Sequence, residues 1–377
     1  MGYRMNKGLR NELITLLGIG TVAALALRKP RAAGALGLGA AVLAVAVSQK
    51  KTSFRQKNVI ITGGSRGLGL ALAQELIREG ARVTLIARDA KELERARHNL
   101  LSINPNAKVL TITGDVTKKE DMERAISEVV IQWGGIDLLI NNAGAILVGP
   151  FDSLRREDFQ AQLELHLFAV MQAVQMVLPH FRKQKSGRIL NICSMGGKVA
   201  VPHMLPYDTS KFALAGFSQG LAAELRQEGI TVTTVYPTLM NTGSPIQAVF
   251  KGDYEQEYAW FAAGDNLPGV AMNARVAARK IIQAARDGKA EFNPSAMGQL
   301  RIGMAVIFPE LMAWTMGLMN RMMPQGKGSE YHTGADSRGY YDTKSWSYFL
   351  RQRAKRVEQQ YNQHPKTDAK FNIGLLH

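Results

Sequence analysis

From residue 58 onward, short runs of aliphatic and β-branched residues alternate with longer amphipathic stretches. The short runs predict strands and the stretches between them predict helices, and repeated strand–helix units build a parallel sheet. The runs show little polar alternation, as strands covered on both faces require. The pattern therefore predicts an α/β fold with a doubly wound parallel sheet. The expected strands are residues 59–62, 82–87, 109–113, 136–140, 188–192 and 230–236.

Residues 1–57 follow a different pattern. Leu13–Leu27 and Ala32–Ser48 are two runs without a charged residue, and a basic segment, 28–31, separates them. Each run is at or below the roughly 20 residues that a spanning helix needs. Basic residues flank both runs, so the positive-inside rule gives no clear orientation.

Three interpretations of this N-terminal segment stay open. It is a membrane anchor, as one span or a shallow hairpin, in which Gly34, Gly37, Gly39 and Ala41 would permit close helix packing. It is a cleaved signal peptide with a basic start and an apolar core, 13–27. It is a pair of helices packed on the protein itself. The anchor is favoured, because a second apolar run does not fit a signal peptide.

The C-terminal part divides into two segments. Residues 296–325 are apolar and methionine-rich, with Pro309 inside, and predict a helical segment on a membrane or a lid beside an apolar pocket. A terminal core helix is the alternative, because methionine fills cores readily. Residues 326–377 are polar and basic, and predict a mobile or weakly ordered tail in which several aromatic residues dock locally.

The net charge of +16 is concentrated at the two ends of the chain. Residues 1–57 carry ten Lys and Arg and one acid, and residues 326–377 carry nine and five, so the remaining body is nearly neutral. This distribution suits anionic lipid headgroups better than a nucleic acid, and no nucleic-acid partner is expected. Cys193 is the one cysteine, so no disulfide forms within the chain, and the histidine spacing favours no metal site.

A glycine-rich segment, Thr62–Gly69, follows the first expected strand and opens a helix. A pyrophosphate must approach backbone N–H groups at a helix N-terminus, and side chains would block that approach. Glycine also adopts the turn conformations that such a loop needs. The segment predicts a dinucleotide site, and the strand before it and the helix after it make the motif more specific.

A second motif brings together groups for proton transfer. Tyr207 and Lys211 are four residues apart on an expected helix, so both side chains share one face. A free phenol has a pKa near 10, and a neighbouring positive charge favours the phenolate. Ser194 follows the strand 188–192 and lies thirteen residues before Tyr207. Cys193, beside it, is expected to be a small buried filler.

Together these motifs resemble the short-chain dehydrogenase/reductase family, in its single-domain Tyr-x-x-x-Lys branch. The resemblance covers about residues 58–290 and implies an NADP-binding catalytic Rossmann domain over residues 58–295. It implies that Tyr207 donates a proton to a carbonyl oxygen or accepts one from an alcohol. Lys211 would hold the nicotinamide ribose and lower the pKa of Tyr207, and Ser194 would hydrogen-bond the substrate oxygen.

The resemblance also implies a set of cofactor contacts. Asp115 and Val116 follow the third strand, Asn141–Gly144 follow the fourth, and Pro237, Thr238 and Thr242 follow the sixth. Thr238 stands where the family usually has glycine. The complete expected set is Gly63, Ser65, Arg66, Gly67, Leu68, Gly69, Arg88, Asp115, Val116, Asn141, Asn142, Ala143, Gly144, Tyr207, Lys211, Pro237, Thr238 and Thr242.

The second strand indicates which dinucleotide is bound. NAD-selective folds place an acid at its end to bind the ribose 2′-hydroxyl, and Ala87 stands there instead, followed by Arg88. Arg66 lies in the glycine loop. Two guanidinium groups suit a 2′-phosphate, so NADP(H) is the expected cofactor. Asp89 is expected to cap the next helix.

One position departs from the family pattern. The family usually has an asparagine in the helix after the fourth strand, where it supports a proton-relaying water, and His166 stands at that position. Histidine can also hydrogen-bond water and carry protons. The alternative is a polar residue that holds a backbone kink.

These features predict an NADP(H)-dependent oxidoreductase that interconverts a carbonyl and an alcohol. An anchor and an apolar lid favour a small lipophilic substrate and membrane association. The catalytic domain is expected to face the cytoplasm, where reduced cofactor is available, and the resemblance implies a homo-oligomer. A non-catalytic nucleotide-sensing or scaffold protein on the same fold is the main alternative. An epimerase or dehydratase acting on nucleotide sugars fits the glycine spacing less well.

Overall fold

The computed structural model describes residues 7–27, 32–39, 53–267 and 271–364. Its centre is a parallel sheet of seven strands in the order β11-β7-β6-β4-β1-β2-β3. The six expected strands all form, and the seventh, β11, has only two residues, too few for a recognisable run. The strands are β1 Asn58–Thr62, β2 Arg82–Ala87, β3 Val109–Thr113, β4 Leu138–Asn141, β6 Gly187–Ile192, β7 Ile230–Val235 and β11 Glu291–Phe292.

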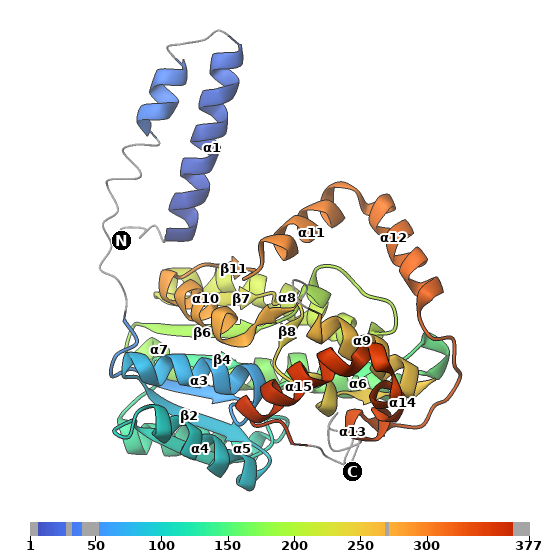
Figure 1. The fold of residues 1–377 in the computed structure, drawn as a ribbon. Coiled ribbons are helices and arrows are strands. Elements are labelled where there is room, and N and C mark those ends of the chain that lie inside the picture. The colour runs from blue at the N-terminus through green and yellow to red at the C-terminus, as the bar shows by residue number, and fades with distance from the viewer. Residues whose placement is uncertain (1–6, 28–31, 40–52, 268–270, 365–377) are drawn as a thin grey trace.

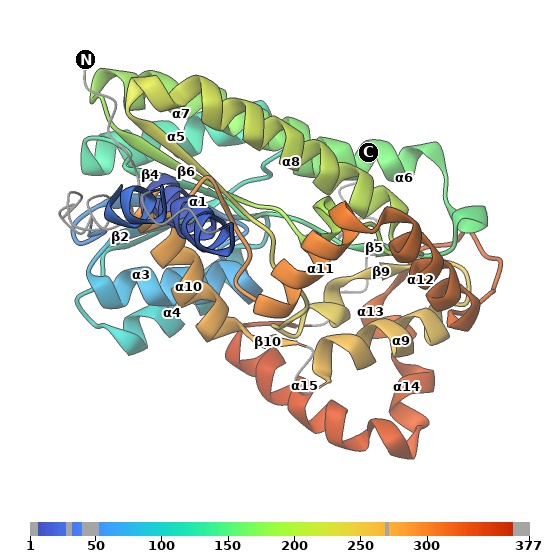
Figure 2. The ribbon, with the colours of Figure 1, turned by 90° about the horizontal axis from the view of Figure 1, so that it is seen from above.

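Helices cover both faces of this sheet, which confirms the doubly wound α/β fold (Figures 1 and 2). On one face, side chains of α3, α4 and α10 pack in a single core cluster, and on the other face α5, α7 and α8 pack in a second. The helices are α3 Gly67–Glu79, α4 Ala90–Ile103, α5 Lys119–Trp133, α6 Arg156–Leu163, α7 Ala169–Lys183, α8 Leu205–Leu225, α9 Tyr254–Asn266 and α10 Ala274–Asp287.

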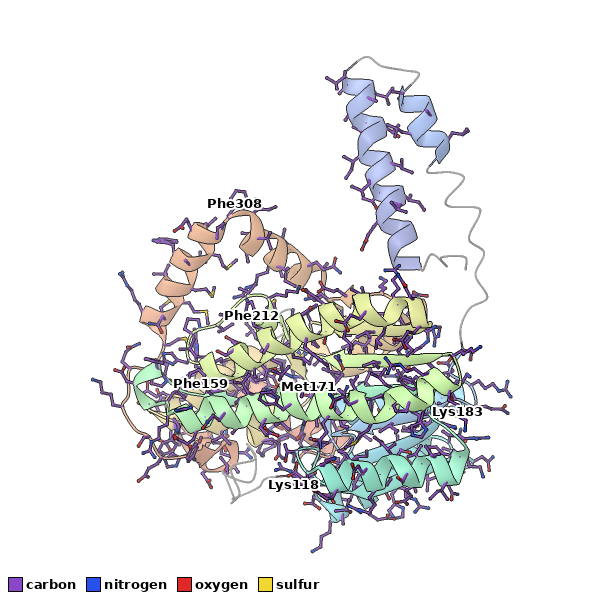
Figure 3. The ribbon with its side chains drawn as sticks, turned by 180° about the vertical axis from the view of Figure 1, so that it is seen from behind. Lys118, Phe159, Met171, Lys183, Phe212 and Phe308 are labelled. Carbon is purple, nitrogen blue, oxygen red and sulfur yellow. The ribbon has the colours of Figure 1, made fainter. Side chains whose placement is uncertain are left out.

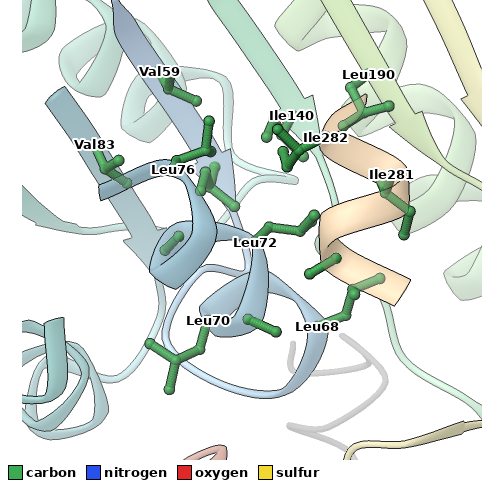
Figure 4. Packing of buried hydrophobic residues seen from close by; sticks show 14 of the residues in the cluster. Val59, Leu68, Leu70, Leu72, Leu76, Val83, Ile140, Leu190, Ile281 and Ile282 are labelled. Carbon is green, nitrogen blue, oxygen red and sulfur yellow. The ribbon is translucent and has the colours of Figure 1, made fainter. Parts of the chain in front are cut away.

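The first core cluster explains why the glycine loop is held firmly. Leu72 and Leu76 of α3 are fully buried against Ile281 and Ile282 of α10 and against the strands (Figure 4). Burying each such side chain contributes about 1.5–3 kcal/mol. The start of α3, which follows the glycine loop, is therefore fixed relative to the carboxyl ends of β1 and β4.

Two small sheets lie beyond the carboxyl ends of the main strands. One joins β5 Leu147–Val148, β9 Val249–Phe250 and β12 His332–Thr333, and the other joins β8 Met240–Asn241 and β10 Met272–Asn273. β12 belongs to the C-terminal segment and pairs antiparallel with β9. The chain after residue 326 is thus hydrogen-bonded to the body of the protein.

The N-terminal apolar runs form two helices that contact each other. α1 spans Lys7–Ala26, and residues 32–39 are also helical. A Cβ atom added at Gly20 would lie 3.3 Å from Leu36, and one added at Gly39 would lie 3.7 Å from Leu17. Of the residues predicted to permit close packing, Gly39 and Gly37 lie at the helix contact, whereas a Cβ atom at Gly34 would meet nothing within 4 Å. Residues 40–48 of the second run, Ala41 included, lie outside the described residues.

The apolar side chains of α1 point mostly outward. Leu16, Ile19, Val22 and Leu25 are each more than half exposed, and Figure 1 shows the helix pair standing away from the α/β body. The interpretation as helices packed on the protein itself is therefore wrong for the described residues.

The Met-rich segment forms two helices, α11 Ala296–Ile307 and α12 Pro309–Met322, with an angle of 115° between them. Phe308 lies at the elbow (Figure 3). Only Gly298 is buried in α11, and α12 has no buried residue. The alternative of a terminal core helix is therefore wrong.

By length and composition, the described residues contain one helical stretch that could cross a membrane, and the bent α11–α12 pair would be a second if it were one span. The first, Arg156–Lys183, is nearly half buried, and its part α7 packs against the sheet. We therefore interpret it as a core helix.

The C-terminal segment corrects one expectation. A mobile or weakly ordered tail was predicted for residues 326–377, but residues 326–364 form α13 Gly334–Ser337, α14 Gly339–Thr343 and α15 Tyr348–Gln360. Residues 365–377 lie outside the described residues. Tyr341, Leu350 and Tyr361 are buried. The polar composition was misleading because a few apolar and aromatic side chains at wide spacing suffice to attach the segment to α9 and α3.

Candidate active site

The glycine loop and the Asn-Asn-Ala-Gly segment are packed directly against each other. Gly63 has φ +62°, and a Cβ atom there would lie 2.8 Å from Cα of Ala143. At Gly69 a Cβ atom would lie 2.2 Å from the carbonyl oxygen of Gly63. Asn142 Nδ2 donates to the carbonyl oxygens of Thr62 and Gly63, each at 3.0 Å. The two motifs therefore support one wall of a cavity together.

This cavity has a volume of about 670 Å³ and lies beyond the carboxyl ends of the central strands. The residues expected for catalysis, Ser194, Tyr207, Lys211 and His166, all line it. So do all of the expected cofactor residues except Gly69 and Asn141. Asn141 Nδ2 donates to Asn191 Oδ1 instead, and Asn191 Nδ2 donates to Ser218 Oγ. Asn141 thus ties β4 to β6 and α8, behind the cavity wall.

The Tyr207, Lys211 and Ser194 side chains meet at the start of α8. Lys211 Nζ lies 5.5 Å from the centroid of the Tyr207 ring and donates to the carbonyl oxygen of Ile192 at 3.1 Å. The Ser194 side chain is hydrogen-bonded to Tyr207, and its Oγ accepts from the Gly196 N–H at 3.0 Å. A phenol, a hydroxyl and an ammonium group are therefore held in fixed positions at one end of the cavity.

Burial controls the protonation of these groups. It raises the pKa of Tyr207, although the hydrogen bond from Ser194 acts in the opposite direction, so the expected lowering of this pKa by Lys211 is not found. Burial also lowers the pKa of Lys211 to about 8. The pKa of Cys193 is raised to about 11 by burial, and its Sγ donates to the carbonyl oxygen of Lys211 at 3.1 Å. Cys193 is thus the buried filler expected, and its thiol stays protonated at neutral pH.

His166 lies in a single π-helical turn, Glu164–Phe168, between α6 and α7. Its Nε2 accepts from the Ala145 N–H at 3.2 Å, and its Nδ1 is 2.7 Å from Ser210 Oγ. Ser210 Oγ donates to the Tyr207 carbonyl, so it accepts from Nδ1–H. Complete burial lowers the pKa of His166 well below its ordinary value. The neutral imidazole therefore joins the π-helical turn to α8 and to the Asn-Asn-Ala-Gly segment, and its part in a proton relay stays a prediction.

Arg88 directly follows β2 and Arg66 lies in the glycine loop, and each of the two expected arginines has a carboxylate partner. Arg66 donates to Glu92 Oε1 at 3.0 Å and to Gln247 Oε1 at 2.9 Å. Arg88 lies 3.9 Å from Asp115 Oδ2. Asp89 caps α4 by accepting from the Glu92 N–H, as predicted. The region around the end of β2 therefore contains two arginines and two carboxylates in ion pairs, and all four residues line the cavity.

Several residues of the cavity were not named from the sequence, although a lid beside an apolar pocket was one expectation for the Met-rich segment 296–325. Glu92 follows the cap Asp89 by three residues, the position where a capping acid is common, and this was the one local signal available. Asp265 of α9, Arg301 of α11, Met319 and Met323 also line the cavity. Gln363 does so from the C-terminal end. These residues come from segments distant in sequence, so no local spacing could reveal them.

The family model for short chain dehydrogenases matches residues 57–249, about half of the chain. This chain belongs to the short-chain dehydrogenase family. The match includes the glycine loop, Asn141–Gly144, Ser194, Tyr207, Lys211 and Thr242, and it confirms the resemblance seen in the sequence. The chain is accordingly an oxidoreductase on a Rossmann-like fold.

Three relatives each align with about half of this chain. "Oxidoreductase BOA17" of Botryotinia fuckeliana is 36% identical over 190 residues, 50% of this chain and 68% of that protein. The 3-dehydrosphinganine reductase of Danio rerio is 31% identical over 194 residues, 51% of this chain and 58% of the relative. The 3-ketodihydrosphingosine reductase of Bacteroides thetaiotaomicron is 34% identical over 185 residues, 49% of this chain and 64% of the relative. The aligned region thus leaves a third or more of both reductases unmatched.

Solved structures support the same fold. A short-chain dehydrogenase from Streptomyces avermitilis superposes with a TM-score of 0.60 at 25% identity, covering 72% of this chain and all of that one. L-sorbose reductase from Gluconobacter frateurii, solved with NADPH and L-sorbose, superposes with a TM-score of 0.58 at 24% identity, covering 65% of this chain and 97% of that one. The latter supports the fold alone.

Proposed function

We propose that this protein is a membrane-associated, NADP(H)-dependent reductase or dehydrogenase that interconverts a carbonyl and an alcohol on a lipophilic substrate. The observation that carries the proposal is the meeting of Tyr207, Lys211 and Ser194 at one end of the same cavity that the glycine loop borders. A nucleotide sensor or scaffold would not need this arrangement of proton-transfer groups.

In the reduction, the Tyr207 hydroxyl donates its proton to the carbonyl oxygen as the carbonyl carbon gains a hydride. Ser194 donates a hydrogen bond to the same oxygen and orients it. When bound, reduced nicotinamide supplies the hydride. Burial raises the pKa of Tyr207, which keeps the phenol protonated, as reduction requires. Lys211 places its ammonium group beside the Tyr207 ring and stabilises the phenolate that remains.

The dinucleotide would lie along the glycine loop, and the residues present fit it. The loop glycines leave space where Cβ atoms would clash, and Ser65, Gly67 and Leu68 line the cavity. We infer NADP(H) because Arg66 and Arg88 both border the corner at the end of β2, where a guanidinium group can pair with a 2′-phosphate. Glu92 and Asp115 balance these charges, so this selectivity needs its own test.

A lipophilic substrate is inferred from the large apolar side chains that line the cavity. Trp260 and Phe261 of α9, Leu267, and Met319 and Met323 of the α12 end supply apolar walls. The helices that supply some of these walls, α11 and α12, are themselves apolar and exposed. A bilayer is an environment that satisfies such a surface. Two relatives are named as reductases of 3-ketosphingoid bases, which are long-chain ketones, and this supports the same substrate class.

The proposal is tested with the full-length protein in detergent, using NADPH and a panel of long-chain ketones that includes 3-ketosphinganine. We expect Tyr207→Phe to reduce kcat by about 10²–10⁴-fold, because it removes the proton donor. The control, Tyr348→Phe, makes the same change at an exposed tyrosine and should retain wild-type turnover. Equal turnover of wild type and Tyr207→Phe would refute the catalytic proposal, and NADPH binding without turnover of any ketone would favour the nucleotide sensor.

Cofactor selectivity is tested by Arg88→Ala, with KM measured for NADPH and for NADH. Loss of one guanidinium–phosphate pair should raise the KM for NADPH by about tenfold and change that for NADH little. The control is Arg97→Ala, which removes an exposed arginine from α4, the helix that follows Arg88 in the chain. An equal effect on both cofactors would remove the basis for NADP(H).

A further inference from the structure

Residues 361–364, named here the C-terminal strap, lie directly on the glycine loop. The Gly67 N–H donates to the carbonyl oxygen of Tyr361 at 3.0 Å. Asn362 Nδ2 donates to the carbonyl oxygens of Ser65 at 2.8 Å and Glu92 at 2.9 Å, and its Oδ1 accepts from Arg95 at 2.9 Å. A segment near the end of the chain is therefore hydrogen-bonded to the loop expected to bind the dinucleotide.

The strap is fixed firmly at both of its ends. Tyr361 is 1% exposed and packs in the core cluster that contains α3. The His364 carbonyl accepts from Gln247 Nε2, and Gln247 Oε1 in turn accepts from Arg66. Asn362 has φ +58°, a conformation that asparagine adopts more readily than most residues. These contacts hold the backbone of Gln363 at the edge of the cavity.

Gln363 has an amide group that is only partly satisfied. The side chain is 6% exposed and lines the cavity. Its Nε2 donates to the Thr242 carbonyl at 3.1 Å and would lie 3.1 Å from a Cβ atom at Gly67. Its Oε1 is buried and has no hydrogen-bond partner among the described residues. A buried acceptor without a donor is costly and is uncommon in folded proteins.

The orientation of this amide is determined by Thr242. A carbonyl oxygen needs a donor, so Nε2 and not Oε1 must face it. The unpaired oxygen then needs a donor, such as a hydroxyl group, that the described residues do not supply, and the second N–H of Nε2 is a donor for a phosphate oxygen. Nε2 lies beside Gly67 and Thr242, two residues expected to contact the dinucleotide. A ribose phosphate is a ligand that offers both kinds of group.

We propose that the C-terminal strap is part of the dinucleotide site, and that the Gln363 amide binds the ribose–phosphate portion of the cofactor. This inference rests on the proposed function, because it requires that the cavity hold a nicotinamide dinucleotide. It adds a binding residue from outside the part of the chain that matches the family model, residues 57–249. It also implies that cofactor binding protects the C-terminal strap further from local opening.

The test measures NADPH binding to the full-length protein by the fluorescence of the bound nicotinamide. Gln363→Glu has nearly the same shape but places a negative charge beside the phosphates, and we expect it to raise the Kd by about tenfold or more. Gln363→Met removes both polar groups and should raise the Kd by a smaller factor. Gln359→Glu makes the same charge change at an exposed position and should bind NADPH as the wild type does.

A second readout does not depend on a substitution. Hydrogen exchange of the wild-type protein should show slower exchange in a peptide containing 361–364 when NADPH is added. Thermal melting of each variant shows whether it is folded, and if Gln363→Glu does not fold, Gln363→Met and the exchange result decide.

The outcomes separate this inference from the function on which it rests. If the wild-type protein does not bind NADPH, the proposed function fails. If the wild type binds NADPH while both Gln363 variants bind it equally well, or if exchange in the strap is unchanged, the inference alone is overturned.

Discussion

Helices α3 and α12 have nearly the same length and are both rich in apolar residues, yet their surroundings are opposite. α3 has 13 residues and buries ten of them, whereas α12 has 14 residues and buries none. α3 lies between the sheet and its neighbouring helices, while α12 contacts mainly α11. Hydrophobic content therefore does not determine burial, and a helix with an unburied apolar surface points to a partner outside the chain.

The largest expected difference concerns core packing. Leu72→Ala in α3 should reduce the free energy of unfolding by about 2–5 kcal/mol, because the side chain is completely buried and leaves a cavity. Leu318→Ala in α12, where 45% of the residue is exposed, should change it by less than about 0.5 kcal/mol. Chemical denaturation of the two variants measures both values. A large loss at Leu318 would mean that α12 is packed against the protein in solution.

Two glycines, Gly69 in α3 and Gly317 in α12, allow a second comparison of the same substitution in the two helices. Gly69→Ala in α3 should destabilise the protein by roughly 1–3 kcal/mol, because the new Cβ atom would lie 2.2 Å from the Gly63 carbonyl oxygen. Gly317→Ala in α12 meets no atom within 4 Å and should stabilise the helix by up to about 1 kcal/mol. Thermal melting should show shifts of opposite sign, and shifts of the same sign would contradict the close approach at Gly69.

Membrane binding tests the exposed helix directly. In protein lacking residues 1–50, Trp314→Glu in α12 should weaken binding to anionic lipid vesicles by about tenfold, since a large exposed side chain no longer enters the interface. Phe349→Glu, an equally exposed change on α15, is the control. Vesicle co-sedimentation measures both. If the truncated protein does not bind vesicles at all, the N-terminal helices are the sole anchor.

The last comparison concerns the response of a buried acid and an exposed acid to pH. Burial raises the pKa of Asp265 to about 8 from an ordinary value of 3.8. The folded protein therefore holds this proton between about pH 4 and pH 8 while the unfolded chain releases it, so stability falls as the pH rises through that range. Asp265→Asn should remove this slope and make the protein more stable at pH 8 than the wild type, because no buried carboxyl then has to lose its proton. Glu310→Gln, at an exposed acid of α12, should leave the slope unchanged when melting is followed against pH.

Most of the sheet and the chemical centre could be predicted from the sequence because their signals are local. Each strand is a short apolar run, the glycine loop joins one strand to one helix, and Tyr207 and Lys211 are one helical turn apart. Local spacing also indicated the cap at Asp89. In contrast, the pairing of Arg66 with Glu92 involves residues 26 positions apart and was not predicted.

The structure of the C-terminal segment, residues 326–364, depends on tertiary contacts. Its polar composition indicated a loose tail, but Tyr361 is buried beside α3 and Asn362 bonds to Ser65, 297 positions away. No local pattern encodes such a contact, because it depends on how α9, α14 and α15 place the end of the chain. The sequence by itself determined the strands, the cofactor loop and the reacting groups, all of which short-range spacing controls. Only the tertiary structure decided that α12 is exposed, that His166 joins a π-helical turn to α8, and that Gln363 lines the cavity, because burial and hydrogen bonding at these positions depend on distant segments.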